Sequence, residues 1–354
     1  MSSLKEYAEK FDCGDETERV YAAEDIGYLN APEGVPALLE RLPQECSPAV
    51  RDAIFQALIR IDGDIAIEGA VQLLASEDPQ IRNQAVDVLR RKGAQAIPFL
   101  NTVMRAGDKD LRKLVLDVLS EVQSGDAGEI YQAALSDQDP NVVITAVENL
   151  GRMRAAEYRG RIEDLLLSDA HPMLVAACLE ALLGIGNPAS LEAIRRRFPE
   201  LGALPDFLLA SSLKAVAALG SEREFAEVAR LLPVRGRHLR PAILSALLAI
   251  YPRCRPGADA DLLAVLQALV ENGDPPLCRY QAVRVLGFWA DSDDVCAFLV
   301  SCLSSPERLV RLGAAESLRM ATRPGLDPRP GLDPVLEARA REESDEEVLQ
   351  ALGS

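Results

Sequence analysis

Several residues and motifs that catalytic or metal-binding proteins need are scarce in this chain. It has only two histidines, His171 and His238, and none of its seven cysteines stand in a Cys-x-x-Cys pair. Zinc sites need clustered cysteine and histidine ligands, so we expect no metal site, and we expect no cofactor. The sequence lacks the nucleophile-elbow, phosphate-loop and zinc-protease motifs. An acid–base pair of carboxylates stays open, because the sequence holds many of them.

Long apolar runs and an excess of positive charge are also missing. No apolar stretch reaches 18 residues, and the N-terminus has no apolar core like that of a signal peptide, so we expect no transmembrane helix and a cytoplasmic location. The odd cysteine count fits reduced thiols in that compartment. The net charge is −17, which disfavours nucleic acid and anionic membranes as partners. Aromatic residues make up only 5%, and the apolar set is rich in Ala, Leu and Val, as packed helices require.

A helical pattern recurs along the chain. In the stretch 76–93, Asp78 is predicted to cap a helix, Pro79 to occupy its first position and Gly93 to end it. Ten such helix starts, 30 to 39 residues apart, define anchors at Glu16, Pro48, Pro79, Lys109, Pro140, Pro172, Asp206, Arg237, Pro276 and Arg308. A second amphipathic segment fills the rest of each period. One helix pair cannot bury its apolar face alone, so the sequence predicts an all-α, right-handed α-solenoid of about ten helix-turn-helix units.

These motifs resemble those of HEAT repeats. "EDPQIRNQAVDVLRRKG" and "DPNVVITAVENLGRM" carry the Asp-Pro turn, the Ala-rich helix and the period near 31 best. The chain is most similar to the short bacterial repeats called phycobilisome-lyase-like. The resemblance implies a bacterial solenoid whose second helices line a concave wall. Metal-binding hydroxylases of related fold carry His-Glu ligand pairs, and this sequence has no His-Glu dipeptide.

Four segments are predicted along the chain. They are an N-terminal capping segment (1–14), the repeats (15–322), a Pro/Gly linker (323–334) and C-terminal capping helices (335–354). The linker holds the tandem "RPGLDPRPGLDP", for which a proline-rich recognition motif is the alternative. We expect Ser344 to cap the last helix.

Two polar columns appear when the anchors are aligned. The third residue after the anchor is arginine in seven units: Arg19, Arg51, Arg82, Arg112, Arg240, Arg279 and Arg311. Regular recurrence favours a structural ladder between neighbouring units over ligand binding. The eighth residue is polar in the first six units: Glu24, Gln56, Asp87, Asp117, Glu148 and Glu180. It stands between two apolar columns, so we expect an acidic row on the concave wall, either an ordinary solvated face or a trough for a basic partner segment.

Basic residues gather in a later part of the chain. The cluster comprises Arg195, Arg196, Arg197, Arg235, Arg237 and Arg240. It is either solvated local charge or a site for an anion or an acidic partner segment. Trp289, the only tryptophan, is either an exposed partner anchor or part of the packing between units.

The sequence favours a non-catalytic scaffold or adaptor for cytoplasmic proteins. The expected partner carries a basic segment and binds the acidic row. The alternative, which the resemblance suggests, is an accessory lyase or isomerase of the phycobilin-lyase type that acts on a protein-bound chromophore.

Overall fold

The fold is a solenoid of paired helices. The computed structural model describes residues 9–11, 14–122, 127–168, 171–321 and 332–353, and these contain helices and no strand. They form two compact units, residues 1–155 (unit 1) and 156–354 (unit 2). The all-α, repeated helix-pair architecture expected from the sequence is confirmed. Most of segment 1–14 and residues 323–331 of the expected linker lie outside the described residues, so these two assignments stay predictions.

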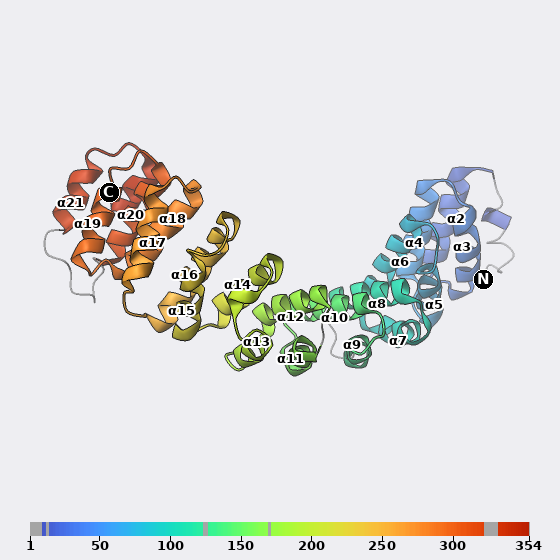
Figure 1. Ribbon diagram of the computed structural model, residues 1–354. Coiled ribbons are helices and arrows are strands. Elements are labelled where there is room, and N and C mark those ends of the chain that lie inside the picture. The colour runs from blue at the N-terminus through green and yellow to red at the C-terminus, as the bar shows by residue number, and fades with distance from the viewer. Residues whose placement is uncertain (1–8, 12–13, 123–126, 169–170, 322–331, 354) are drawn as a thin grey trace. The chain divides into compact units, whose positions relative to one another are not determined.

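Unit 1 has two layers of helices (Figure 1). Its second-helix layer, named for the second helix of each repeat, is α2 (Glu16–Tyr28), α4 (Pro48–Arg60), α6 (Pro79–Lys92), α8 (Lys109–Glu121) and α10 (Pro140–Arg152). Its first-helix layer is α3 (Val35–Arg41), α5 (Asp64–Leu73), α7 (Ile97–Ala106) and α9 (Gly128–Ala134). Consecutive helices within each layer pack against each other.

Unit 2 repeats the arrangement. Its second-helix layer is α12 (Pro172–Ile185), α14 (Asp206–Leu219), α16 (Arg240–Cys254), α18 (Pro276–Leu286), α20 (Arg308–Ala321) and α22 (Glu346–Leu352). Its first-helix layer is α11 (Arg159–Ser168), α13 (Ser190–Arg197), α15 (Glu222–Leu231), α17 (Ala260–Glu271), α19 (Asp293–Cys302) and α21 (Leu332–Ala340). Short 3-10 turns, such as η7 (Arg237–Leu239) and η8 (Gly287–Trp289), join several of the helices.

The predicted helix starts agree with the structure in nine of the ten repeats. The exception is the eighth, where α16 begins at Arg240 because Arg237 opens the 3-10 turn η7. In α6 the side chain of Asp78 accepts a hydrogen bond from the amide of Gln80, Pro79 opens the helix and Gly93 ends it at φ 61°. The expected cap at Ser344 is wrong: Asp345 caps α22 and accepts hydrogen bonds from the amides of Glu347 and Val348.

A continuous apolar spine connects the helices of unit 1. The tenth residue after each anchor is fully buried: Ile26, Leu58, Leu89, Leu119 and Leu150. At Gly27 the backbone of α2 lies so close to α4 that an added Cβ would come within 2.8 Å of the Ala57 Cα. Because the spine fixes the rotation of each helix, residues of equal rank in successive helices form rows along the unit.

Candidate functional site

The acidic row of unit 1 lies on the second-helix layer. It holds Glu24, Gln56, Asp87, Asp117 and Glu148, one from each of five consecutive helices. All except the half-buried Glu24 are exposed. Burial of the seventh and tenth positions turns the eighth toward solvent at the edge of the apolar spine. The sixth member, Glu180, is exposed on α12 of unit 2.

Arginine side chains interrupt this row. Arg90 on α6 lies 3.2 Å from Asp87 and 3.8 Å from Glu121. The two helices α4 and α6, together with Glu121 of α8, line a polar groove of about 480 Å³ whose walls include Gln56, Asp87 and Arg91. The groove therefore carries both signs of charge, and the acidic character continues beyond it at Asp117 and Glu148.

The carboxyl group of Asp117 has a raised pKa. Although the residue is exposed, neighbouring side chains partly remove water from its carboxyl group and raise its pKa, and the charges of Arg152, Arg90 and Lys113 oppose this effect. No ion pair joins Asp117 or Glu148 to another described residue. The carboxylates are thus available to an incoming cation.

In unit 2 the acidic residues eight positions after the anchors form ion pairs with residues of the same unit. Lys214 on α14 lies 2.7 Å from Glu180 on α12. Arg284 on α18 pairs with Glu316 on α20, and the Tyr280 hydroxyl donates to the same carboxylate over 2.8 Å. Neighbouring charges of opposite sign neutralise each other here, in contrast to the row of unit 1.

The recurrent arginines connect each repeat to the next one. Arg19 on α2 donates two hydrogen bonds to Glu45, which lies in the turn before α4, at 2.9 and 3.3 Å. Arg51 reaches Asp78 in the next turn, and Arg112 forms a bidentate pair with Asp137 at 2.7 Å. Arg82 differs because it donates to carbonyl groups of its own turn.

The same geometry continues in unit 2. Arg240 pairs with Asp274, Arg279 with Glu307 over 2.8 Å, and Arg311 with Glu343 at 2.8 and 3.1 Å. The six acidic partners of the bridging arginines, which lie 25 to 34 residues further along the chain, are Glu45, Asp78, Asp137, Asp274, Glu307 and Glu343. These arginines use their hydrogen-bond donors in contacts between neighbouring repeats, which leaves them few donors for a ligand.

The basic cluster of unit 2 is divided by its ion pairs. Arg195 bonds the buried Glu224, Arg235 lies 3.2 Å from Asp206, and Arg240 pairs with Asp274. Arg197 lies over the ring of Phe198 at 5.5 Å. Only Arg196 and Arg237 are exposed with no ion pair among the described residues. An anion site built from all six arginines thus stays a prediction, and these two offer its most accessible cations.

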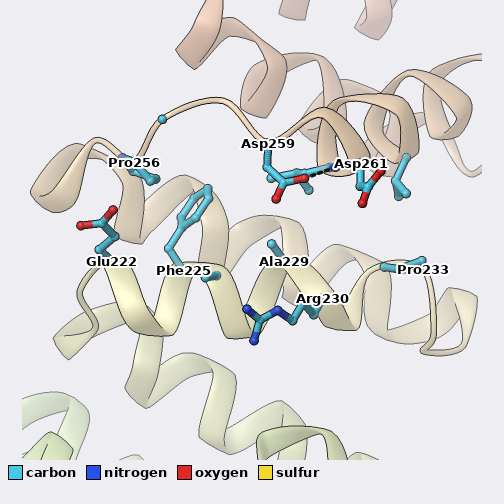
Figure 2. Close-up of a pocket in the computed structure, with 12 residues that line it drawn as sticks. Glu222, Phe225, Ala229, Arg230, Pro233, Pro256, Asp259 and Asp261 are labelled. Carbon is cyan, nitrogen blue, oxygen red and sulfur yellow. Dashed lines mark hydrogen bonds between the residues drawn. The ribbon is translucent and has the colours of Figure 1, made fainter.

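A pocket of about 460 Å³ separates α15 from α17 in unit 2. Phe225, Ala229, Pro256 and Leu262 contribute apolar surface to it. Figure 2 shows Phe225 rising from α15 toward the loop that carries Pro256 and Asp259. This loop follows α16 and belongs to the longest interval between anchors, 39 residues. Two of these extra residues, Pro256 and Gly257, line the pocket.

Aromatic packing holds the loop in place. The buried Trp289 donates from Nε1 to the carbonyl of Pro256 over 3.0 Å. Tyr251 stacks on Phe288 at 3.8 Å and donates to its carbonyl, and Phe225 meets the Trp289 ring edge-on. Trp289 therefore takes the packing role, the second of its two expected roles.

The described residues contain no cluster of three or more His, Cys, Asp or Glu side chains that could hold a metal ion. In the same part of the chain no helix has the length and apolarity to cross a membrane. His171 stands at the start of α12, but its side chain makes no capping bond there.

Sequence reasoning missed the arginines of the groove and the pocket. The helical neighbours of Asp87 at three and four residues include Arg90 and Arg91, so a search at this spacing would have found the basic wall of the groove. The pocket forms where the repeat pattern fails, and its signal was the 39-residue interval itself.

The profile of the HEAT repeats matches residues 128–200 and 262–354. The stretch between the two matches contains α14, α15 and α16, and its two anchors, Asp206 and Arg237, are not proline. Over 71 residues, 20% of this chain, the sequence is 38% identical to the bilin biosynthesis protein PecE of Mastigocladus laminosus, of which the match spans 26%.

Solved structures of similar fold are much longer. Kap121p aligns over 99% of this chain and 44% of its own, with a TM-score of 0.57 at 13% identity. The karyopherin Kap121p bound to the extreme C-terminus of the protein phosphatase Cdc14p aligns with a TM-score of 0.56 at 13% identity, over 45% of its length. The chain thus spans less than half the length of these structures, and identity at this level shows the fold alone.

Proposed function

We propose that this α-solenoid, in which two stretches match the HEAT-repeat model, is a non-catalytic scaffold that binds a partner protein on the acidic row of unit 1. The favoured contacts are Glu24, Asp87, Asp117 and Glu148. The partner segment is basic and lies across successive second helices. Stacked repeats present such extended surfaces, and complementary charge accelerates association and selects among partners.

The observation that carries this proposal is a difference in ion pairing between the acids eight positions after the anchors in unit 1 and those in unit 2. In unit 2 Glu180 and Glu316 are neutralised by Lys214 and Arg284 from adjacent helices. In unit 1 Asp117 and Glu148 have no such partner among the described residues. Carboxylates in a row that form no ion pair attract a cationic chain, and the net charge of −17 adds to this attraction at longer range.

Charge reversal of the row tests the proposal. The variant Asp87→Lys/Asp117→Lys/Glu148→Lys is compared with the wild type in affinity purification from the native host, with the bound proteins quantified by mass spectrometry at low and moderate salt. We expect recovery of basic partners to fall by about tenfold or more, and wild-type recovery to decrease as salt increases.

A second triple variant controls for net charge. Glu40→Lys/Glu68→Lys/Glu129→Lys makes the same change in charge on α3, α5 and α9 of the first-helix layer, where all three side chains are exposed. It is expected to retain the partners. Unchanged recovery with the row variant, or equal loss with both folded variants, would refute binding at the row.

The partial match to PecE supports a second candidate function. That relative is a bilin biosynthesis protein, so an accessory lyase or isomerase acting on a protein-bound chromophore is the alternative. This alternative predicts a coloured ligand after purification from a bilin-producing cell, or a bilin absorbance change on mixing. A colourless protein that leaves the bilin spectrum unchanged would argue against it. The cytoplasmic location remains a prediction.

A further inference from the structure

The pocket between α15 and α17 has a lining of mixed chemistry. Its apolar surface comes from Phe225, Ala229 and Leu262, with Pro256 on the loop side. The charged residues of the lining are three acids and one base: Glu222, Asp259, Asp261 and Arg230. In Figure 2 Glu222 lies at one end and Asp261 toward the other, while the guanidinium of Arg230 is turned away from Asp259 and Asp261. The opening is therefore negative above an apolar floor.

The acidic groups of the pocket retain hydrogen-bonding capacity. Asp259 accepts a hydrogen bond from the amide of Leu262 over 3.0 Å as the cap of α17. Glu222 and Asp261 are exposed, and neither forms an ion pair with a described residue. A cation with several donors is the complement of such a site, and an apolar stem is the complement of the floor.

The pocket is formed before any ligand arrives. Arg255, at φ 45°, ends α16 in the left-handed conformation and turns the chain into the loop. The bond from Trp289 to the Pro256 carbonyl then holds the loop against the aromatic cluster. Because the walls are fixed, binding would cost little ordering of the protein.

We propose that this pocket binds an arginine side chain of a partner peptide. The guanidinium donates to Asp261, the methylene stem covers Ala229 and Leu262, and the charge of Glu222 at the other end of the pocket adds longer-range attraction. Arginine suits the site better than lysine because its planar guanidinium forms two parallel hydrogen bonds to one carboxylate and stacks on flat surfaces. The proposal goes beyond the scaffold function, because it adds a site on the first-helix layer of unit 2.

Trp289 provides the readout, because it is the only tryptophan and its indole bonds the pocket loop. The peptide acetyl-Ala-Arg-Leu-amide is titrated into the full chain while tryptophan fluorescence is recorded, and calorimetry gives an independent affinity. The matched peptide contains citrulline, which keeps the shape of arginine without its charge. We expect binding of the arginine peptide to be about fivefold or more tighter than that of the citrulline peptide.

Variants connect the binding to the pocket. Glu222→Gln/Asp261→Asn is expected to abolish the preference for arginine, and Ala229→Phe to block both peptides by filling the floor. The control Asp294→Asn makes the same change at the second residue of α19 and is expected to bind as the wild type does. Circular dichroism verifies that each variant folds. If Ala229→Phe does not fold, the variant Glu222→Gln/Asp261→Asn, whose changes are exposed, tests the site by itself.

Equal affinity for the two peptides, or an unchanged preference in Glu222→Gln/Asp261→Asn, would overturn the proposal. The row variant Asp87→Lys/Asp117→Lys/Glu148→Lys is expected to keep the peptide response, since its changes lie in unit 1. A failure of the pocket and a failure of the scaffold function are therefore distinguishable.

Discussion

At the scale of single residues, Glu45 is an acid of the arginine ladder that two arginines bond. Its side chain is 1% exposed and accepts hydrogen bonds from Arg19, Arg41 and the amide of Ser47. Burial alone would raise its pKa, but these hydrogen bonds outweigh burial and lower the pKa from 4.5 to about 2. The charged form is therefore the form that stabilises the folded chain.

The substitution Glu45→Gln is expected to lower the free energy of unfolding by about 2 to 4 kcal/mol at pH 7, because it removes the buried carboxylate that pairs with Arg19 and Arg41. Urea denaturation measures the change. Glu40→Gln, on the exposed face of α3, is the matched control and should change stability by less than about 0.5 kcal/mol. Equal effects of the two substitutions would show that the ladder contributes nothing measurable.

The pH dependence of stability follows from the same residues. Hydrogen bonds from Arg311 dominate at Glu343 and also lower its pKa to about 2. A carboxyl group whose pKa is lower in the folded chain than in the unfolded chain stabilises the fold fully when the pH is above its unfolded pKa, near 4.5. This stabilisation is lost as the pH falls toward the folded pKa, about 2. Stability of the wild type should therefore fall between about pH 5 and 2, and Glu45→Gln/Glu343→Gln should show a shallower fall. Parallel pH profiles would contradict this assignment.

At the scale of helices, close contact between α2 and α4 depends on Gly27. Alanine is the better helix former by about 1 kcal/mol, but its Cβ at this position would lie 2.8 Å from the Ala57 Cα. Because backbone cannot move aside as a flexible side chain can, we expect Gly27→Ala to destabilise the chain by about 1 to 3 kcal/mol. Gly160→Ala on α11 meets no atom within 4 Å and should be neutral or stabilising. Thermal denaturation of both variants tests the difference, and destabilisation by both would discount the contact.

The helices were largely predictable from the sequence, because caps and apolar periodicity are local signals. Asp78, Pro79 and Gly93 delimit α6 as expected. The errors occur where two residues compete for one role: Asp345 caps α22 in place of Ser344, and a 3-10 turn displaces the start of α16 from Arg237 to Arg240. The acidic row was predictable in position but not in its pairing. Whether Glu180 meets Lys214 depends on side-chain reach between helices, which the sequence does not show, whereas the contact of Asp87 with Arg90 three residues later on α6 could have been found from the spacing.

At the scale of the molecule, stability is a sum over neighbouring helix pairs. Each second helix packs on the next one within its unit, and the ladder joins adjacent turns. A solenoid of this kind loses structure locally, since each repeat contacts only its neighbours. Damage at one position should therefore not be felt equally along the chain.

Hydrogen exchange of the full-length Gly27→Ala variant tests this locality. We expect faster amide exchange in peptides from α2 and α4, where the added methyl group separates the helices, and unchanged exchange in α18 and α20, which belong to unit 2. Mass spectrometry of peptic fragments resolves these helices, and Gly160→Ala supplies the baseline. A uniform increase across both units would mean that the chain unfolds as one cooperative body, and a partner bound at the acidic row would then stabilise α20 as much as α4. A gradient that ends within unit 1 would mean that such a partner stabilises only the repeats it touches, which leaves the pocket of unit 2 free to act on its own.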